Sequence, residues 1–517
     1  MRPLLEVIPT AHTPESLVET LRGADGIVLL RTAQFDSPAA RYSFVTAQPF
    51  LTFRSFGSRC EVARAAAAPI SQLPTPICQT QFGNPWQILD ALMARCELLD
   101  EIDSPFPMGG AFGYWGYDLK NFTEPKLPRR AVNDLELPDC HVGFYDSLVV
   151  FDHQLGQVTV VSTGLDAEGS RRETRAAERL EFWRQQLTKT LIPALSLSKR
   201  ERENTFPGLS DTQPSEVDAQ REPFPPRPRH GGEGRGEGLV RSNVTRAEFI
   251  AAVERAQRYI RSGDIYQVNL SQRLSVQCGL TGWELFTRLS DVSPAPFAAY
   301  LDCGDFQLAS SSPEQFLRLS GSHIVTRPIK GTRPRAPDAT RDAQLAYELQ
   351  TSAKELAELV MITDLLRNDL GKVCEYGSVQ TPDLARLEKF AQVQHLVSTV
   401  EGRLRQTITH FAAFAACFPG GSITGAPKFR AMEIIDELEP LSRGPYCGAL
   451  GYLGFNRESQ LNIAIRTAVC REGLAHFNVG AGIVADSAPA AEYAETLAKA
   501  AGFLAALNLA AESVAAG

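Results

Sequence analysis

The segment Phe418-Pro-Gly-Gly-Ser-Ile-Thr-Gly-Ala-Pro-Lys428 holds three glycines and two prolines within eleven residues. Such a composition predicts a tight turn whose backbone adopts conformations that other residues avoid. A helix is expected directly after it, from about Lys428 to Leu438. Exposed backbone N–H groups at the start of such a helix can bind an anion. The Gly-Lys-Ser/Thr ending of a nucleotide-binding P-loop is absent, so nucleotide is not the expected ligand.

Two further segments extend this pattern toward the C-terminus. Val479-Gly-Ala-Gly482 predicts a second loop where the backbone is closely approached. Arg466 lies in an alternating segment, 462–467, that is typical of a strand, and its guanidinium could pair with a carboxylate through two hydrogen bonds. His395 stands alone, and most single histidines are structural.

Two expected helices carry glutamates three residues apart, so that each pair shares a helix face. One is a long amphipathic helix from Leu345 to Leu366, closed by 367–371, and the other runs from Ala490 to Leu507 after Pro489. The glutamates are Glu355 and Glu358 on the first helix and Glu492 and Glu495 on the second, with Lys499 one turn on. Four carboxylates brought together would need a cation, and oxygen ligands alone favour Mg²⁺. Spacing by itself favours two solvated helix faces.

The segment Thr326-Arg-Pro-Ile-Lys-Gly-Thr-Arg-Pro-Arg335 holds four cations, two prolines and a glycine within ten residues. The prolines predict a stiff loop, and Gly331 allows a tight turn. Lys330 lies at the centre of this loop. Taken alone, it is either a solvated turn cation or a positioned nucleophile.

The remaining chain predicts alternating strands and helices on both sides of a Pro/Gly-rich stretch. Residues 193–240 cannot bury enough apolar surface to offset their ordering entropy, so a disordered linker or insertion is expected there. The expected strands are 26–30, 109–117 and 265–274, with hairpins at 147–151/158–162 and 299–301/306–310; the expected helices are 171–187 and 245–262, the latter with capping-box spacing at Thr245 and Glu248.

Composition narrows the function classes. The net charge is −8 and the pI about 5.7, which argues against binding to nucleic acid or to an anionic membrane. Ten scattered cysteines without metal-site spacing predict buried thiols in a reducing compartment. The chain shows no signal-peptide pattern and no apolar run of membrane-spanning length, so a cytoplasmic protein is expected.

Together these segments resemble the chorismate-utilising enzymes, densely over 245–512 and more loosely over 1–190. The strongest marks are Arg367-Asn-Asp369, Gly420 to Lys428, Ala464-Ile-Arg-Thr467 and Glu492-x-x-Glu-Thr496. The resemblance implies an α+β fold of two packed β-sheets surrounded by helices. It divides the chain into an N-terminal subdomain (1–192), the linker or insertion (193–240) and a chorismate-binding catalytic domain (241–517).

The resemblance also implies a Mg²⁺-chorismate site. Glu358 and Glu495 match the metal ligands, with Glu355 and Glu492 beside them. His395 matches a catalytic histidine near the reacting ring. The residues that match groups holding the substrate are Thr424, Gly425, Tyr452, Arg466, Gly482 and Lys499, with Gln267 at a position that sorts the subfamilies.

Gln267 and Lys330 distinguish the subfamilies. Gln267 stands where isochorismate and salicylate synthases carry a lysine that activates water, which disfavours water as the nucleophile. Lys330 stands where anthranilate synthases have alanine, and resembles the lysine of aminodeoxychorismate synthase component I, an enzyme of 4-aminobenzoate and folate biosynthesis. Arg327, Arg333, Mg²⁺ and partial burial are expected to favour its neutral amine, which could then attack chorismate.

Some positions depart from the family pattern. The usual histidine after the first metal-site glutamate is Leu359, and the segments 29–32 and 293–297 differ from those of tryptophan-sensing relatives. No glutaminase domain is visible, so ammonia is expected from a separate glutamine amidotransferase subunit or from solution. Anthranilate synthase component I is the nearest alternative, and a non-catalytic chorismate-binding or scaffolding protein is a more distant one.

Overall fold

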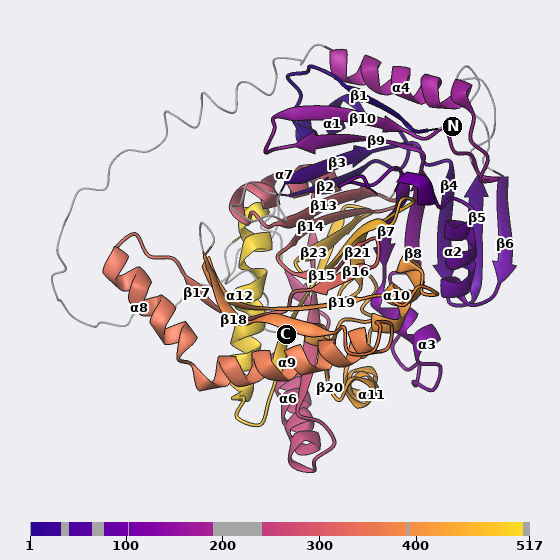
Figure 1. Cartoon of the computed structure of the whole chain (residues 1–517). Helices are drawn as coiled ribbons and strands as arrows, with labels where there is room; N and C mark the ends of the chain where they lie inside the picture. The colour runs from indigo at the N-terminus through magenta and orange to yellow at the C-terminus, as the bar shows by residue number, and fades with distance from the viewer. Residues whose placement is uncertain are drawn as a thin grey trace, which may run out of the picture.

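A computed structural model describes residues 2–32, 41–64, 77–101, 103–189, 240–389 and 393–509. Two large β-sheets pack face to face, with helices around them (Figure 1). The predicted linker, 193–240, lies outside the described residues except for Val240, so its disorder and the domain boundaries there remain predictions.

Each sheet contains twelve strands. The first runs in the order β1 (Leu4–Val7), β10 (Gln157–Ser162), β9 (Ser147–Asp152), β3 (Tyr42–Thr46), β2 (Val28–Arg31), β13 (Phe297–Asp302), β14 (Gln307–Ser312), β23 (Thr467–Arg471), β24 (Leu474–Ile483), β12 (Gln267–Gln277) and β11 (Arg241–Ser242), with β20 (Gly425–Ala426) paired to β12. The second runs β17 (Ile329–Pro334), β19 (Val393–Arg403), β16 (His323–Thr326), β15 (Gln315–Ser320), β22 (Glu458–Ile463), β21 (Ala449–Gly454), β7 (Gly110–Trp115), β8 (Cys140–Tyr145), β4 (Leu51–Phe56), β5 (Arg59–Arg64) and β6 (Ile77–Phe82), with β18 (Gln380–Lys389) paired to β19.

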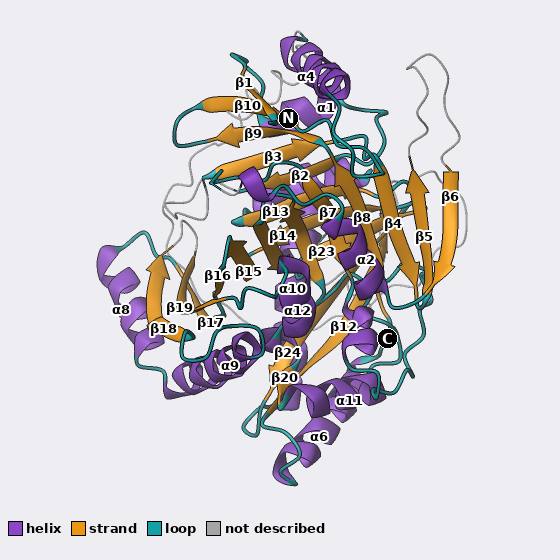
Figure 2. Cartoon of the chain, turned by 45° about the vertical axis from the view of Figure 1, so that its right-hand side comes forward, coloured by secondary structure: helices purple, strands orange, loops and turns teal. Residues whose placement is uncertain are grey.

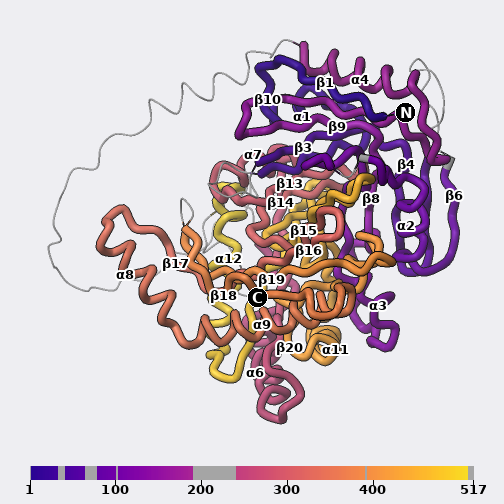
Figure 3. The backbone as a smooth tube through the Cα atoms, viewed as in Figure 1, coloured from indigo at the N-terminus to yellow at the C-terminus, as the bar shows by residue number. Residues whose placement is uncertain are grey.

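Both sheets draw strands from the N-terminal and the C-terminal parts of the chain. β2 pairs with β13 in the first sheet, and β7 pairs with β21 in the second. Figure 3 shows the indigo strands of the N-terminal part lying directly beside rose and yellow strands. The α+β architecture and the expected hairpins are therefore confirmed.

The helices are α1 (Pro14–Thr20), α2 (Pro85–Ala94), α3 (Lys120–Thr123), α4 (Glu173–Thr188), α6 (Arg246–Arg261), α7 (Gly282–Val292), α8 (Ala339–Gln350), α9 (Ala353–Gly371), α10 (His410–Cys417), α11 (Lys428–Leu438) and α12 (Pro489–Ala506). The capping box predicted for α6 is present, because Glu248 and Thr245 each accept a hydrogen bond from the other's backbone N–H. The helix expected over 428–438 is also confirmed.

The single helix expected from Leu345 to Leu366 is wrong, because two helices cover this range. α8 ends at Gln350, and Ser352 begins α9 by accepting a hydrogen bond from the Glu355 N–H at 3.4 Å. The apolar periodicity continues across the break, so the pattern could not reveal it. Figure 2 shows α8 and α9 beside β17, β18 and β19.

Apolar side chains form two main clusters. The larger joins residues of both sheets, such as Phe44 of β3 and Trp115 of β7, with Phe414 of α10, and the second packs one face of the first sheet against α1, α4, α7 and α12. All ten cysteines are free and only Cys78 is exposed, so buried thiols are confirmed for the other nine. Within the described residues, no helix is long and apolar enough to cross a membrane.

Candidate active site

Lys330 lies on β17, a strand at the edge of the second sheet, and not in the stiff loop that the sequence predicts. It pairs with Leu396 of β19, while Thr332 pairs with His395, and the register shifts at Gly331 between them. Gly331 has φ +72°, and a Cβ there would lie 2.7 Å from Leu349 and 3.1 Å from a Glu355 carboxylate oxygen. This bulge therefore requires glycine and fixes the strand against α8 and α9.

The Lys330 amine meets β12 and β24 at Gly482. A Cβ on Gly482 would lie 2.6 Å from Gln267 Nε2 and 3.9 Å from Lys330 Nζ. The expected loop over 479–482 is wrong, because these residues belong to β24, with Gly482 paired to Asn269. Gln267 is buried, and its Oε1 has no hydrogen-bond partner among the described residues. The glycine thus opens space around the lysine and an unsatisfied amide oxygen.

The glycine-rich segment is fixed to β12 beside Gln267. Gly425 and Ala426 form β20, which pairs with Val268 and Gln267. A side chain on Gly425, whose φ is +138°, would collide with the Gln267 carbonyl. Thr424 is fully buried, and its hydroxyl donates to the Gly420 carbonyl at 3.1 Å. Thr424 therefore closes the turn, and its hydroxyl is engaged within it.

Lys428 joins this segment to α9. Its Nζ donates to Asp369 Oδ2 at 2.5 Å, to the Cys417 carbonyl at 3.0 Å and to the Pro419 carbonyl at 2.8 Å. Asp369 is buried and also accepts from Lys372 at 2.9 Å. The Arg367-Asn-Asp369 and Gly420–Lys428 motifs are thus two sides of one buried ion pair.

Glu358 and Glu495 approach each other from α9 and α12. Glu358 Oε2 lies 4.0 Å from Lys330 Nζ, and Glu495 pairs with Lys499 at 2.8 Å. Burial raises the pKa of Glu358, the Lys330 cation opposes this, and the nearby charges of Glu355 and Glu495 raise it further. These two carboxylates lie close enough to influence one another.

The four glutamates do not form one cluster. Glu355 pairs with Arg333 at 3.5 Å, and Glu492 is buried. Among the described residues, no three His, Cys, Asp or Glu side chains gather closely enough for a metal site. Mg²⁺ commonly takes only one or two protein carboxylates and completes its shell with water or substrate oxygens. The donor set at Glu358 and Glu495 fits this mode.

The arginines beside Lys330 are neutralised. Arg327 pairs with Glu388, and Arg333 with Glu355. The expectation that both cations act directly on the lysine is therefore weakened, because each charge is offset by a carboxylate. Lys499 donates to the Gly480 carbonyl at 2.8 Å, which places its amine near the same strand as Gly482.

His395 and Arg466 lie close together. His395 Nδ1 lies 2.9 Å from Thr332 Oγ1 and 3.4 Å from the Gly331 carbonyl. Burial lowers the pKa of His395 to about 4, the Gly331 bond opposes this, and the Arg466 charge lowers it further. Its imidazole is therefore neutral at pH 7. Arg466 lies between β22 and β23 with φ +49°, so the predicted strand position is wrong. The Arg466 side chain is exposed to solvent. The protein around it still removes part of its hydration, which lowers the pKa of Arg466.

Tyr452 is not brought to this site. It lies on β21 among Tyr42, Phe44 and Phe112, with the Phe112 ring 5.3 Å away, and lines a separate cavity. Tyr446 lies nearer to the site than Tyr452 does. Its hydroxyl lies 2.7 Å from the position that a Cβ on Gly480 of β24 would take. It comes from the turn before β21, whereas Tyr452 points from the strand into the apolar layer, a difference that the sequence does not reveal.

Sequence reasoning missed Glu314. This residue immediately precedes β15 and is 8% exposed. Burial raises the pKa of Glu314, while a hydrogen bond from Ser422 and the Lys330 charge oppose the rise. A raised pKa favours the protonated carboxyl, the form in which Glu314 could serve as a proton donor beside the lysine. The surrounding run, 310–316, shows no sequence signal of this environment.

Comparisons with known proteins place the chain in a family of enzymes that bind chorismate. The family model of chorismate binding enzymes matches residues 49–505. The chain is 37% identical to aminodeoxychorismate synthase component 1 of Escherichia coli (strain K12), over 91% of each chain. It is 34% identical to anthranilate synthase component 1 of Acetivibrio thermocellus, over 98% of this chain and 95% of that relative. The solved anthranilate synthase component I from Streptococcus pneumoniae TIGR4 superposes with a TM-score of 0.68 at 29% identity, covering 90% of this chain and 93% of that one.

Proposed function

The chain belongs to the family of chorismate-binding enzymes, and within it we propose that the protein converts chorismate and ammonia to 4-amino-4-deoxychorismate, as an aminodeoxychorismate synthase component I. The observation that carries this proposal is the placement of the Lys330 amine at Gly482 and Gln267, with Glu358 at 4.0 Å. A lysine at this point offers a nucleophile that an alanine cannot.

In the first step, the neutral Lys330 amine attacks carbon 2 of the chorismate ring and forms a C–N bond. The ring double bonds shift, and the hydroxyl on carbon 4 leaves as water after taking the proton of Glu314. The attacking amine passes one proton to the Glu314 carboxylate as it becomes a secondary amine. Glu314 suits this role because burial raises its pKa, which favours the protonated form that a proton donor needs.

In the second step, ammonia attacks carbon 4, the double bonds shift back, and the bond from Lys330 to carbon 2 breaks. One proton of the resulting ammonium group returns to Glu314, and the departing lysine amine regains the proton that it lost. The sum is chorismate plus ammonia giving 4-amino-4-deoxychorismate plus water. The enolpyruvyl group is retained throughout.

The other residues orient the substrate. Arg466 and Lys499 would pair with its two carboxylates, and neutral His395 would offer hydrogen bonding near the ring without adding charge. Glu358 and Glu495 would hold Mg²⁺, which would offset the carboxylate charge of the substrate and of Glu358 beside the Lys330 amine. Gln267 cannot act as a base at neutral pH, so activation of water at its position is disfavoured.

Ammonia is proposed to come from a separate glutamine amidotransferase subunit. The "component 1" in the relatives' names supports an enzyme of more than one component. A cytoplasmic location, and the absence of nucleic-acid and membrane partners, remain predictions from composition.

Anthranilate synthase component I is the second candidate, favoured by relatives of that name at similar identity. Incubation of the protein with chorismate, ammonium salt and Mg²⁺ distinguishes the two. We expect 4-amino-4-deoxychorismate by mass spectrometry, without pyruvate release. Fluorescent anthranilate with equimolar pyruvate would support the alternative, and no turnover at all would favour a non-catalytic chorismate-binding protein.

A further inference from the structure

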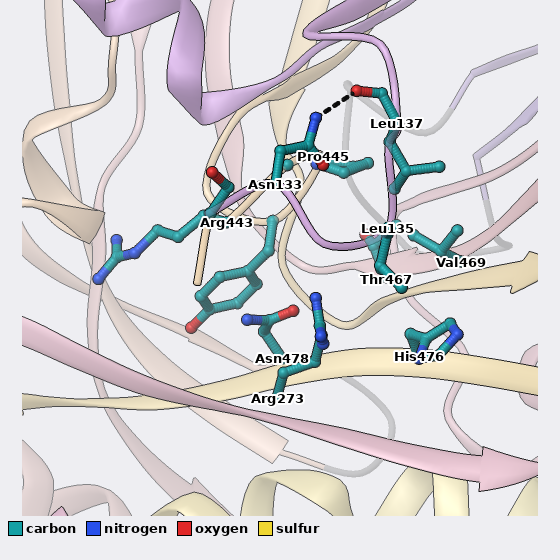
Figure 4. A pocket seen from close by; sticks show the side chains of 13 residues that line it. Asn133, Leu135, Leu137, Arg273, Arg443, Pro445, Thr467, Val469, His476 and Asn478 are labelled. Carbon is teal, nitrogen blue, oxygen red and sulfur yellow. Dashed lines mark hydrogen bonds between the residues drawn. The ribbon is translucent and has the colours of Figure 1, made fainter. Parts of the chain in front are cut away.

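Arg443 is a buried cation that lies behind the site and that the mechanism above does not use. It is 4% exposed and follows α11 in the turn that leads to Tyr446. Figure 4 shows Arg443 beside a small cavity near Asn133 and Thr467, with its guanidinium directed away from Val469 and His476. A buried guanidinium must be matched by acceptors, so its partners reveal its role.

The guanidinium of Arg443 binds Glu439 and two backbone carbonyls. Nε and Nη2 donate to the two Glu439 oxygens at 2.8 and 2.7 Å. Nη1 donates to the Ile423 carbonyl at 3.2 Å, and Nη2 donates to the Asn269 carbonyl at 2.8 Å. Four of its five N–H groups are thus assigned to protein acceptors, which leaves Arg443 unsuited to binding a substrate carboxylate.

These contacts join the two segments that form the floor of the site. Ile423 directly precedes Thr424 and Gly425 in the glycine-rich segment. Asn269 follows Gln267 by two residues on β12 and pairs with Gly482. Glu439 tightens the junction by accepting from the Ser271 N–H at 2.8 Å and from its hydroxyl at 3.1 Å.

The N-terminal part of the chain covers this junction. The Arg443 guanidinium lies 4.7 Å from the centre of the Tyr117 ring and 5.7 Å from that of Tyr446. Gly444 donates its N–H to Asp118 at 2.9 Å and accepts from the Tyr117 N–H at 2.8 Å. The Arg443–Glu439 pair is therefore shielded from water. Its hydrogen bonds are stronger there than they would be at the protein surface.

We propose that Arg443 is a positioning residue for the chemistry at Lys330: by holding the Ile423 and Asn269 carbonyls together, it sets the distance between the glycine-rich segment and the Gln267–Gly482 face. This inference rests on the proposed function only for the identity of the reaction. It predicts that loss of the guanidinium slows the chemical step more than it weakens chorismate binding.

The test uses a charge-neutral double variant, Arg443→Met with Glu439→Gln. Removing one partner of a buried ion pair is strongly destabilising, whereas replacing both is often neutral. The amide that replaces the Glu439 carboxylate can still accept from Ser271, but the Ile423 and Asn269 carbonyls lose their donor. We expect the double variant to fold with a melting temperature lowered by the two unpaired carbonyls, and its kcat to fall about tenfold or more, since small misplacements of reacting groups cost up to ~100-fold. KM for chorismate should change much less than kcat.

A control is the more exposed Arg41–Asp152 pair, which is also held by two guanidinium nitrogens; Arg41 directly precedes β3 and Asp152 ends β9, in the N-terminal part of the first sheet. Arg41→Met with Asp152→Asn should leave both kinetic constants unchanged. Arg443→Lys serves as a second variant, because it keeps the charge beside Glu439 but a single ammonium cannot span both carbonyls. It should fold and show the same fall in kcat.

A folded double variant or Arg443→Lys with the wild-type kcat would overturn the proposal. Equal changes in KM and kcat for both would also overturn it, because they would indicate a general loss of structure. The product formed by the wild type is measured in the same assay. If that product were anthranilate, the proposed function would fail while the ratio of variant to wild-type rates would still test Arg443.

Discussion

Gly482 is the residue around which the proposed chemistry is arranged, because its missing side chain leaves room for the Gln267 amide beside the Lys330 amine. A Cβ there would lie 2.6 Å from Gln267 Nε2, which real Cβ atoms do not tolerate without displacement of a neighbour. The backbone of Gly482 is otherwise that of an ordinary strand, with no positive φ recorded. Glycine is therefore needed at this position for its lack of a side chain and not for its backbone conformation.

We expect Gly482→Ala to fold normally and to lose turnover about tenfold or more, because the added methyl displaces the Gln267 amide that lies beside the lysine. Steady-state rates and a thermal melt check both parts. Gly279→Ala is the matched control, since no atom lies within 4 Å of its added Cβ. A fully active Gly482→Ala enzyme would show that the space is not needed.

Glu314 gives the site a pH dependence with a definite sign. Burial raises the pKa of Glu314 above its ordinary value, so its protonated form persists to higher pH than a surface glutamate allows. As a proton donor it becomes inactive when the pH rises through that raised pKa. The single-turnover rate of the wild type should therefore decline on the alkaline side of its optimum.

Glu314→Gln should lower the single-turnover rate by about 100-fold, within the range of general acid catalysis, and should abolish this alkaline decline. Rates measured by rapid quench across the pH range check both effects. A variant that keeps the wild-type pH profile would assign the proton donor to another residue.

The carboxylates of Glu358 and Glu495 are expected to support Mg²⁺-dependent activity. Each change to glutamine keeps the shape but removes a charge that the cation needs. We expect Glu358→Gln and Glu495→Gln each to raise the Mg²⁺ concentration required for half-maximal rate, with little change in melting temperature. Titration of activity after chelator treatment checks this. Wild-type rates at limiting Mg²⁺ would remove these residues from the metal site.

Among the helices and strands, those determined by local sequence could be predicted. The helix break between α8 and α9 and the pairing of β17 with β19 could not. The helix over 428–438 and the hairpins followed from turn composition and periodicity, which are local. The break between α8 and α9 did not, because an N-cap serine interrupts an apolar pattern that stays in phase. The strand containing Lys330 was also missed, since its pairing with β19 is set by residues more than sixty positions away.

Lys428 joins the glycine-rich segment to α9 through its ion pair with Asp369. Removing its amine leaves the buried Asp369 with only Lys372 and frees two loop carbonyls. We expect Lys428→Met to destabilise the protein by about 3 kcal/mol and to impair turnover. Lys372→Met, at a lysine whose side chain is 46% exposed, should cost much less. Chemical denaturation of both variants checks the difference. Equal losses of stability would contradict this role of Lys428.

At the scale of the whole molecule, both sheets are completed by strands from the two parts of the chain. The residues proposed for chemistry, from Gln267 to Lys499, all lie in the C-terminal part, but Tyr117 and Asp118 pack over the Arg443 junction beneath them. Fold and family could be predicted because several motifs occur in a fixed order. The positions of Glu314 and Tyr446 could not, because their burial and distances depend on contacts between distant segments.

The central claim is that Lys330 is the nucleophile, and the mass of the intact protein tests it most directly. The protein is incubated with chorismate and Mg²⁺ without ammonia, and the same sample is analysed for single-turnover consumption of chorismate. We predict a gain of the mass of chorismate less one water, mapped by peptide analysis to residues 326–335 and absent from Lys330→Arg, whose guanidinium stays protonated. An adduct on another residue, or no adduct together with an unimpaired Lys330→Ala enzyme, would contradict it.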